Sequence, residues 1–262
     1  MSSWPQALFE QHPAFRLLHP LLGQFRAIPT HADWDQLPSP ARSPSGAPIR
    51  FVDPDSITAY YELAIYQHGT VATRLNWHDT FNALIWHRFP RLKIALNQLH
   101  QRQISQASAP NIRGPVRDAA TLFDECGFIL PYSQPALLEL LQQHRWEALF
   151  LTERAAWGQT IAAYSFGHAN FENLLAPFVG LTGKCWPIAV AAEFFSWPLD
   201  LQLNWLDGEL AAAVDADQLQ TPRQLPPLPY LGIPGWYPQQ DTAFYQNTAY
   251  FRPKRQTIPS KV

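Results

Sequence analysis

Apolar residues recur every three to four positions along much of the chain, which is the spacing of one face of an α-helix. The pattern predicts helices near 78–89, 91–104, 115–125, 135–155, 167–176 and 199–214. Shorter apolar runs predict strands at 48–52, 128–132 and 185–195. Gly127 directly follows the third helix, where a glycine commonly ends a helix. The chain is therefore expected to be mostly helical, with a few short strands.

Residues 60–75 fit two periods at once. Apolar and polar side chains alternate around His68-Gly69, which is typical of a β-hairpin. Tyr61, Ile65 and Tyr66 also fit one helix that would end at Gly69. We interpret the segment as a hairpin, and the helix stays open as the alternative.

Both ends of the chain differ from the middle. Residues 1–47 mix short apolar pieces with Pro, Ser and Gly and are expected to be irregular, ahead of a helix-rich main domain over 48–220. Residues 221–262 are rich in proline and aromatic residues, and proline at this density forbids helix and favours extended backbone. We expect an arm packed on the domain, its aromatic rings filling surface grooves. These rings are Trp236, Tyr237, Phe244, Tyr245 and Phe251.

A different interpretation of the arm starts from Leu-Pro-Pro-Leu-Pro at 225–229, which could bind a partner protein as a polyproline ligand or support self-association. In either case the expected fold class is α+β. It is a helix-dominated single domain with short strands or a small sheet and an extended, Pro/aromatic-rich C-terminal arm.

Composition narrows the class of protein. The chain has 262 residues, 47% hydrophobic and 15% charged, which suits one compact core. Its net charge of -2 gives no electrostatic footprint for nucleic acid or an anionic membrane. Cys126 and Cys185 are too few for a disulfide framework, and neither an export signal nor a membrane-spanning run is visible. A reducing cytoplasm is the expected location.

The helix expected at 78–89 carries polar residues on its apolar face. Successive residues turn by about 100° around a helix, which places His78 and Asn82 inside the apolar arc and His87 and Thr80 opposite it. The arc consists of Phe81, Leu84, Ile85, Trp86 and Phe89. A buried polar group without a partner costs about 1–3 kcal/mol. Some other group is therefore expected to contact His78 and Asn82.

The helix expected at 167–176 repeats this arrangement. His168 and Glu172 lie four residues apart on its apolar face, and Asn170 and Asn173 lie on the other side. A histidine nitrogen and a carboxylate at this spacing can bind one metal ion or form an acid–base pair. Two such helices that face each other would build one buried site.

Carboxylates on the helix expected at 115–125 are weaker candidates. Asp118 and Glu125 lie seven residues apart on its polar side, together with Arg117 and Asp124. This is also the pattern of any solvated surface helix. If the helix lies near the two His pairs, Asp118 or Glu125 could reach a cleft floored by them.

Two hypotheses of different classes follow. In the first, the chain is a metal-dependent hydrolase of a small or mid-sized substrate, with one divalent metal ion. Its ligands would be His78, His168 and Glu172. Asn82 would orient substrate or ligand, and Asp118 or Glu125 would be the general base for a water molecule activated by the ion. No P-loop, dinucleotide fingerprint or serine nucleophile motif is present, so no nucleotide cofactor is expected.

In the second hypothesis the protein is non-catalytic. The His pairs form a hydrogen-bond network in the core, and the C-terminal arm binds a partner. A pocket that reaches His78 and His168 would favour the enzyme, whereas a network sealed from water would favour the structural role.

Several long stretches resemble a known family. They are NWHDTFNALIWHRFPRLKIALNQLH (76–100), RGPVRDAATLFDECG (113–127), FGHANFENLLAPFVGLTG (166–183) and LPYLGIPGWYPQQDTAFYQNTAYFRPKR (228–255). Together they resemble a proteobacterial family catalogued as domain of unknown function 3025, over about residues 50–255. The resemblance implies a bacterial, cytoplasmic protein whose tail belongs to the domain, and it implies no activity.

Overall fold

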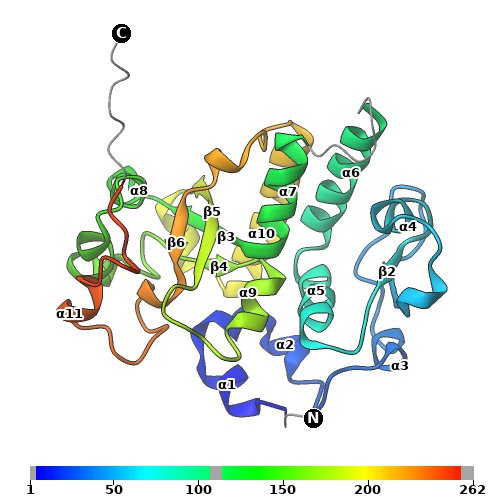
Figure 1. Cartoon of the computed structure of the whole chain (residues 1–262), viewed down its shortest axis with the longest axis horizontal. Coiled ribbons are helices and arrows are strands. Elements are labelled where there is room, and N and C mark those ends of the chain that lie inside the picture. The colour runs from blue at the N-terminus through cyan, green and yellow to red at the C-terminus, as the bar shows by residue number, and fades with distance from the viewer. Residues whose placement is uncertain (1–3, 107–113, 255–262) are drawn as a thin grey trace.

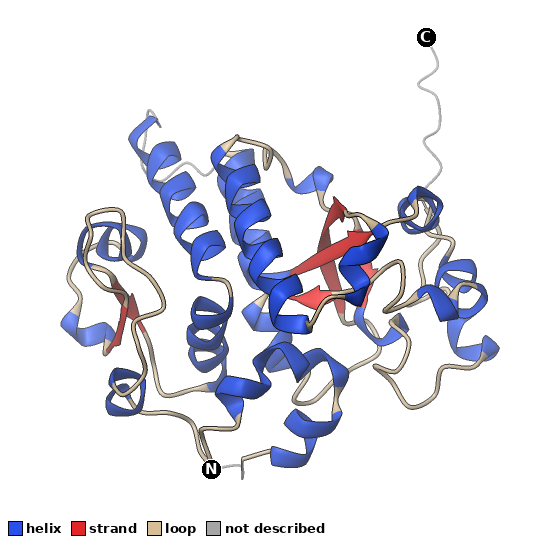
Figure 2. Cartoon of the chain, turned by 180° about the vertical axis from the view of Figure 1, so that it is seen from behind, coloured by secondary structure: helices blue, strands red, loops and turns tan. Residues whose placement is uncertain are grey.

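Helices fill the centre of the molecule, and two small sheets lie on opposite sides of them (Figures 1 and 2). The computed structural model describes residues 4–106 and 114–254. Its buried apolar side chains form one core cluster. The helix-dominated, single-domain α+β fold expected from the sequence is thereby confirmed.

The helices vary from single turns to five turns. They are α1 (Gln6–Gln11), α2 (His19–Leu22), α3 (His31–Asp35), α4 (Tyr61–His68), α5 (Trp77–Arg88), α6 (Pro90–Gln106), α7 (Pro115–Cys126), α8 (Pro135–Gln142), α9 (His168–Asn173), α10 (Leu199–Asp215) and α11 (Thr242–Tyr245). No helix of the described residues has the length and apolar character needed to cross a bilayer.

The strands form a two-stranded and a four-stranded sheet. They are β1 (Arg50–Val52), β2 (Thr70–Ala72), β3 (Gly127–Tyr132), β4 (Tyr164–Ser165), β5 (Thr182–Ala189) and β6 (Pro227–Pro229). The larger sheet has the order β4-β3-β5-β6, with β3 and β5 parallel and both outer strands antiparallel to their neighbours. β3 is buried along nearly its whole length, as expected for a central strand covered on both faces.

The hairpin expected at 60–75 is wrong, and the alternative helix is present as α4. Gly69 ends it in the left-handed conformation, with φ 68°, and its N–H donates to the carbonyls of Ala64 and Ile65. A left-handed residue at this point is easiest for glycine, which has no Cβ. The strand that follows, β2, pairs in parallel with β1. The alternation around His68-Gly69 therefore marks a helix-to-strand junction.

Two other expected elements end early. The helix predicted over 135–155 stops at Gln142, and His144 adopts φ 56° before a π-helical turn at Ala148–Thr152. The strand predicted over 185–195 stops at Ala189, because its partner β3 ends at Tyr132, and a 3-10 helix follows at Ala192–Ser196. Apolar residues continue in the same pattern through both segments, which is why both predicted elements are longer than the observed ones.

The C-terminal arm is packed on the domain over its described part. Trp236, Tyr245 and Phe251 are buried, and Tyr237 and Phe244 are partly buried against the core. The residues Pro227–Pro229 form an edge strand of the larger sheet. The arm also contains α11, so the expectation that its proline content forbids helix is wrong for this turn. This turn falls in the proline-free stretch after Pro238 and is capped by Asp241. Residues 255–262 of the predicted arm lie outside the described part.

A candidate metal site between three helices

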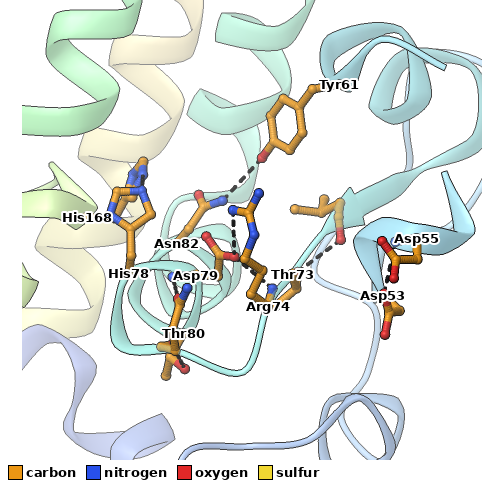
Figure 3. Close-up of polar contacts among 12 residues, drawn as sticks. Asp53, Asp55, Tyr61, Thr73, Arg74, His78, Asp79, Thr80, Asn82 and His168 are labelled. Atoms are coloured by element: carbon orange, nitrogen blue, oxygen red, sulfur yellow. Dashed lines mark hydrogen bonds and ion pairs between the residues drawn. The ribbon is translucent and has the colours of Figure 1, made fainter. Parts of the chain in front are cut away.

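The ends of three helices bring together two histidines and a glutamate. His78 lies in the first turn of α5, Glu125 in the last turn of α7, and His168 begins α9. The Nε2 atoms of His78 and His168 are 3.1 Å apart, and Oε2 of Glu125 lies 3.5 Å from Nε2 of His168 and 3.9 Å from Nε2 of His78. Figure 3 shows the two imidazole rings side by side. Three ligand-type atoms therefore converge on one point.

Local sequence explains how the helices meet. The side chain of Asn76 accepts the N–H of Asp79 at 2.8 Å, which fixes the start of α5 and hence the direction of His78. Gly167 sets the start of α9 against the end of α7. A Cβ there would lie 2.4 Å from the backbone nitrogen of Gly127 and 2.5 Å from the Cα of Cys126.

Gly127 is the C-cap of α7, as the sequence predicted, but its φ of -74° is ordinary. Glycine is required there for a different reason. A Cβ at this position would lie 2.2 Å from the carbonyl oxygen of Phe123. The backbones at the junction of α7, β3 and α9 are thus in direct contact.

The outer nitrogens of the two histidines face carboxylates. Nδ1 of His78 is 3.2 Å from Oε2 of Glu172. Nδ1 of His168 is buried without a hydrogen-bond partner among the described residues, and Oδ2 of Asp124 lies 3.9 Å from it. A carboxylate beside Nδ1 favours the tautomer with the proton on that atom. In that tautomer both Nε2 atoms are acceptors, and they point at each other and at Glu125.

The distances fit a cation. A tetrahedral ion with nitrogen and oxygen ligands at about 2.0–2.2 Å holds those atoms about 3.3 Å from one another. The three separations of 3.1, 3.5 and 3.9 Å lie around this value. In the described residues, His78, Glu125 and His168 form a group of metal-ligand type within 4.8 Å.

Burial sets the charge of the cluster. It lowers the pKa of His168 to about 3, so this imidazole is neutral near pH 7, which is the form that binds metals. Burial, with the Asp124 carboxylate beside it, raises the pKa of Glu125 above its ordinary value. Burial would also raise the pKa of Asp124, but the charge and hydrogen bond of Lys93 bring it below the ordinary value instead.

The cluster is open to water on one side. The side chain of His168 is 5% exposed, but those of His78, Glu125 and Glu172 are 35%, 38% and 46% exposed. It is therefore not the sealed network that a purely structural role would produce. The cavity of about 450 Å³ lined by Tyr164 and Gln202 shares no residue with the cluster.

The predicted site residues separate into two groups. His78, His168 and Glu125 meet directly, and Glu172 contacts His78 from outside that group. Asn82 is buried, and it donates to the hydroxyl of Tyr61 at 3.2 Å, away from the histidines (Figure 3).

Asp118 lies apart from both groups. It is exposed two turns before Glu125 on α7, about 10 Å along the helix axis. Its carboxylate forms no hydrogen bond or salt bridge with any residue that the structure describes. Its role as a base stays a prediction.

Several predicted orientations are wrong. Thr80 and Arg117 were expected to face solvent and are buried at 1% and 5% exposure, because α5 and α7 are each covered on more than one side. Glu172, expected on the buried face of α9, is exposed, and Asn170, expected outside, is buried and donates to the carbonyl of Cys126. The described α9 has only six residues, too few for a helical-wheel argument to hold.

Sequence reasoning missed Lys93 and the role of Asp124. The ammonium of Lys93 donates to Oδ1 of Asp124 at 2.6 Å and to Oδ1 of Asn82 at 2.9 Å. A signal was available, because Lys93, Asn97 and His100 repeat at helical spacing beside the apolar face of an amphipathic helix, and all are buried. The same test that selected His78 and Asn82 would have selected them.

Comparison with family profiles matches residues 49–255 to Protein of unknown function (DUF3025). The match covers most of the chain and agrees with the resemblance seen in the sequence, so the chain belongs to this family. Comparisons with curated proteins and with solved structures gave no match.

Proposed function

We propose that His78, Glu125 and His168 bind one divalent metal ion, and that the protein uses this ion to hydrolyse a small or mid-sized substrate. The observation that carries the proposal is the pair of Nε2 atoms 3.1 Å apart, with a carboxylate behind each ring. Glu125 thereby takes the ligand role that was predicted for Glu172, and Glu172 orients His78.

A cation satisfies the cluster better than any tautomer does. If one Nε2 donates to the other, the donor ring has an unprotonated Nδ1 that faces a carboxylate, and two acceptors repel. If both Nδ1 atoms carry protons, the two Nε2 lone pairs face each other. Protonation of His168 would relieve this, but burial lowers the pKa of that ring to about 3. A divalent ion between the rings resolves both conflicts, as would a second proton on His78, and the metal content of the protein distinguishes the two.

The ligand count favours catalysis over a structural role. Three protein ligands leave an open coordination position, whereas structural zinc sites close all four. The exposure of His78 and Glu125 gives water and substrate access to that position. An ion held there supplies a Lewis acid and lowers the pKa of water.

The remaining carboxylates suggest a base. Asp124 is paired with Lys93, whereas Glu172 is nearly half exposed beside His78. Because Glu172 lies at Nδ1 of His78, on the side of the ring away from Nε2, we keep it as the orienting carboxylate and leave the general base with Asp118.

Metal content tests the ligand set. The untagged protein, purified without chelator, is expected to hold close to one equivalent of a transition metal by elemental analysis. His168→Ala should lose it, and His68→Ala, which removes an exposed histidine of α4, should keep it. Equal metal content in the parent and in His168→Ala would overturn the site. If the parent holds metal but hydrolyses no ester, amide or phosphoester in a broad panel, the ligand set is supported and the hydrolase activity is ruled out.

The second hypothesis, a non-catalytic protein, keeps one supporting observation. Lys93, Asp124, Asn82 and Tyr61 do form a connected polar network in the core. This network lies beside the histidines, and it does not explain why their two Nε2 atoms face each other.

A further inference from the structure

A second site lies where the two ends of the chain meet the sheet. A cavity of about 450 Å³ is bounded by the N-terminal 3-10 helix Pro13–Leu18, strand β4, the start of α10 and the C-terminal arm. The Nε2 atom of His12 contacts the carbonyl oxygen of Trp236 at 3.1 Å, which ties the two end segments together. In Figure 1 the N-terminal segment (blue) lies below and beside the arm (orange). The volume is that of a small-molecule site.

The wall of the cavity is aromatic. Trp157, Tyr164, Phe195, Trp197 and Trp236 all line it. The indole N–H of Trp157 already donates to the carbonyl of Leu149 at 2.9 Å, so this ring offers the cavity an apolar surface. Flat rings of this kind favour a flat, apolar ligand body.

The charged residues of the wall are both cations. Arg16 and Arg154 line the cavity, and no aspartate or glutamate does. Among the described residues neither arginine forms a salt bridge. Arg154 donates to the neutral amide of Gln240 at 3.0 Å, and that amide is itself fixed by bonds to Leu231, Ile233 and Gly235. The amide thus positions the guanidinium at the cavity without neutralising its positive charge.

The polar side chains of the wall do not neutralise these charges. The hydroxyl of Tyr164 donates to Oε1 of Gln202, whose Nε2 donates to the carbonyl of Trp197 at 2.8 Å. Burial raises the pKa of Tyr164 to about 12, so the phenol stays uncharged near neutral pH. Because these bonds join β4 to α10, the wall is formed before any ligand enters. The cavity thus combines a preformed aromatic wall with two arginines that have no carboxylate partner among the described residues. These features are complementary to an organic anion.

We propose that this cavity binds a flat, apolar molecule carrying one carboxylate or phosphate group, with Arg16 and Arg154 on the anionic group. The site is separate from the metal cluster and does not depend on it. Arg16 precedes the residues 49–255 that match the family, so the family match covers only part of this site.

The probes are 2-naphthoate, 2-naphthyl phosphate and the neutral 2-naphthamide, titrated into the full chain by calorimetry. At least one anion should bind at one site per chain, and the amide at least tenfold more weakly. Arg16→Gln and Arg154→Gln should each weaken the anion about tenfold, the usual size of a charged hydrogen bond, and leave the amide unchanged. Arg223→Gln, at an exposed arginine outside the cavity, should change nothing.

Two further variants separate this site from the other one. Ala163→Phe places a ring in the cavity and should abolish binding, and His168→Ala with chelator should not alter it. Preference for the carboxylate or for the phosphate identifies the natural anionic group. Equal binding of anion and amide, insensitivity to both arginine variants, or no anion binding up to about 1 mM, where affinity is only about 4 kcal/mol, would each overturn the proposal.

Discussion

Two polar clusters lie side by side between α5, α6, α7 and α9, and they differ in how their atoms are satisfied. In the first, Lys93 donates to Asn82 and Asp124 and lies 5.3 Å from the ring of Trp86, and Asn82 donates to Tyr61. The ammonium of Lys93 and the amide of Asn82 each donate to an acceptor within the protein. In the second, the Nε2 atoms of His78 and His168 and Oε2 of Glu125 converge on one point.

This contrast shows how polar residues on an inward helix face can be interpreted. The sequence gives them one signature, a polar side chain at helical spacing among apolar ones. In the structure, the two clusters that share this signature are distinguished by the balance of their hydrogen-bond donors and acceptors. A cluster in which they balance is complete, and a cluster with an excess of acceptors can hold a cation.

The strongest test of the comparison removes the central donor of the complete cluster. Lys93→Met should lower the free energy of unfolding by about 2–3 kcal/mol, because it leaves Asn82 and Asp124 without their shared donor. The value lies below that of a fully buried pair since Asp124 retains 27% exposure. Urea denaturation with chelator present measures it, with Lys184→Met as control. If His78→Ala costs as much under these conditions, the two clusters are equally complete and the comparison fails.

Added metal should affect only the second cluster. At a free zinc concentration one hundred times the dissociation constant, the parent should gain about 2.7 kcal/mol of stability. Lys93→Met should gain nearly as much, and His168→Ala should gain almost nothing. Thermal denaturation with and without zinc provides the measurement. A gain of equal size in His168→Ala would place zinc elsewhere on the protein.

Acid should destabilise the folded protein, because the imidazole of His168 is buried in its neutral form. The unfolded chain binds a proton at His168 below about pH 6.5, whereas the folded chain binds it only near pH 3, the lowered pKa. Its contribution is complete above pH 6.5 and is lost as pH falls toward 3. From pH 6.5 to 5 the loss is about 2 kcal/mol without metal.

The control for this prediction is His168→Gln, in which the slope of stability against pH should be shallower over the same range. Burial also lowers the pKa of His87 to about 4, and the raised pKa of Glu125 acts in the opposite direction. Both groups remain in the variant, so the difference in slope isolates His168. Parallel curves for the two proteins would contradict the assignment.

The smallest expected effect concerns the orienting carboxylate. Glu172→Gln keeps the size of the side chain and removes its charge beside Nδ1 of His78. Metal affinity should fall about tenfold, at the lower end for such partners because Glu172 is nearly half exposed. Competition with a chromophoric chelator measures the change. A loss as large as that of Glu125→Gln would make Glu172 a ligand, as the sequence analysis first assigned it.

Prediction from sequence worked where long periodic segments decide the answer. The helices α5, α6, α7 and α10 and the pairing of His78 with His168 could all be inferred, because each helix presents several turns of one apolar face. It failed where tertiary packing decides. Thr80 and Arg117 are buried by neighbours that no periodicity reveals, and Glu125 becomes part of the cluster only because α7 ends where α9 begins.

The absence of a side chain at Gly167 has a dynamic consequence. With its Cα directly against the backbone of Cys126 and Gly127, α9 has no layer of side chains on which to slide over α7. On its other side, the ring of Phe171 stacks on Phe81 of α5 at 5.5 Å. The three helix ends are therefore closely packed, and an ion bound there would cost little conformational entropy in ordering its ligands.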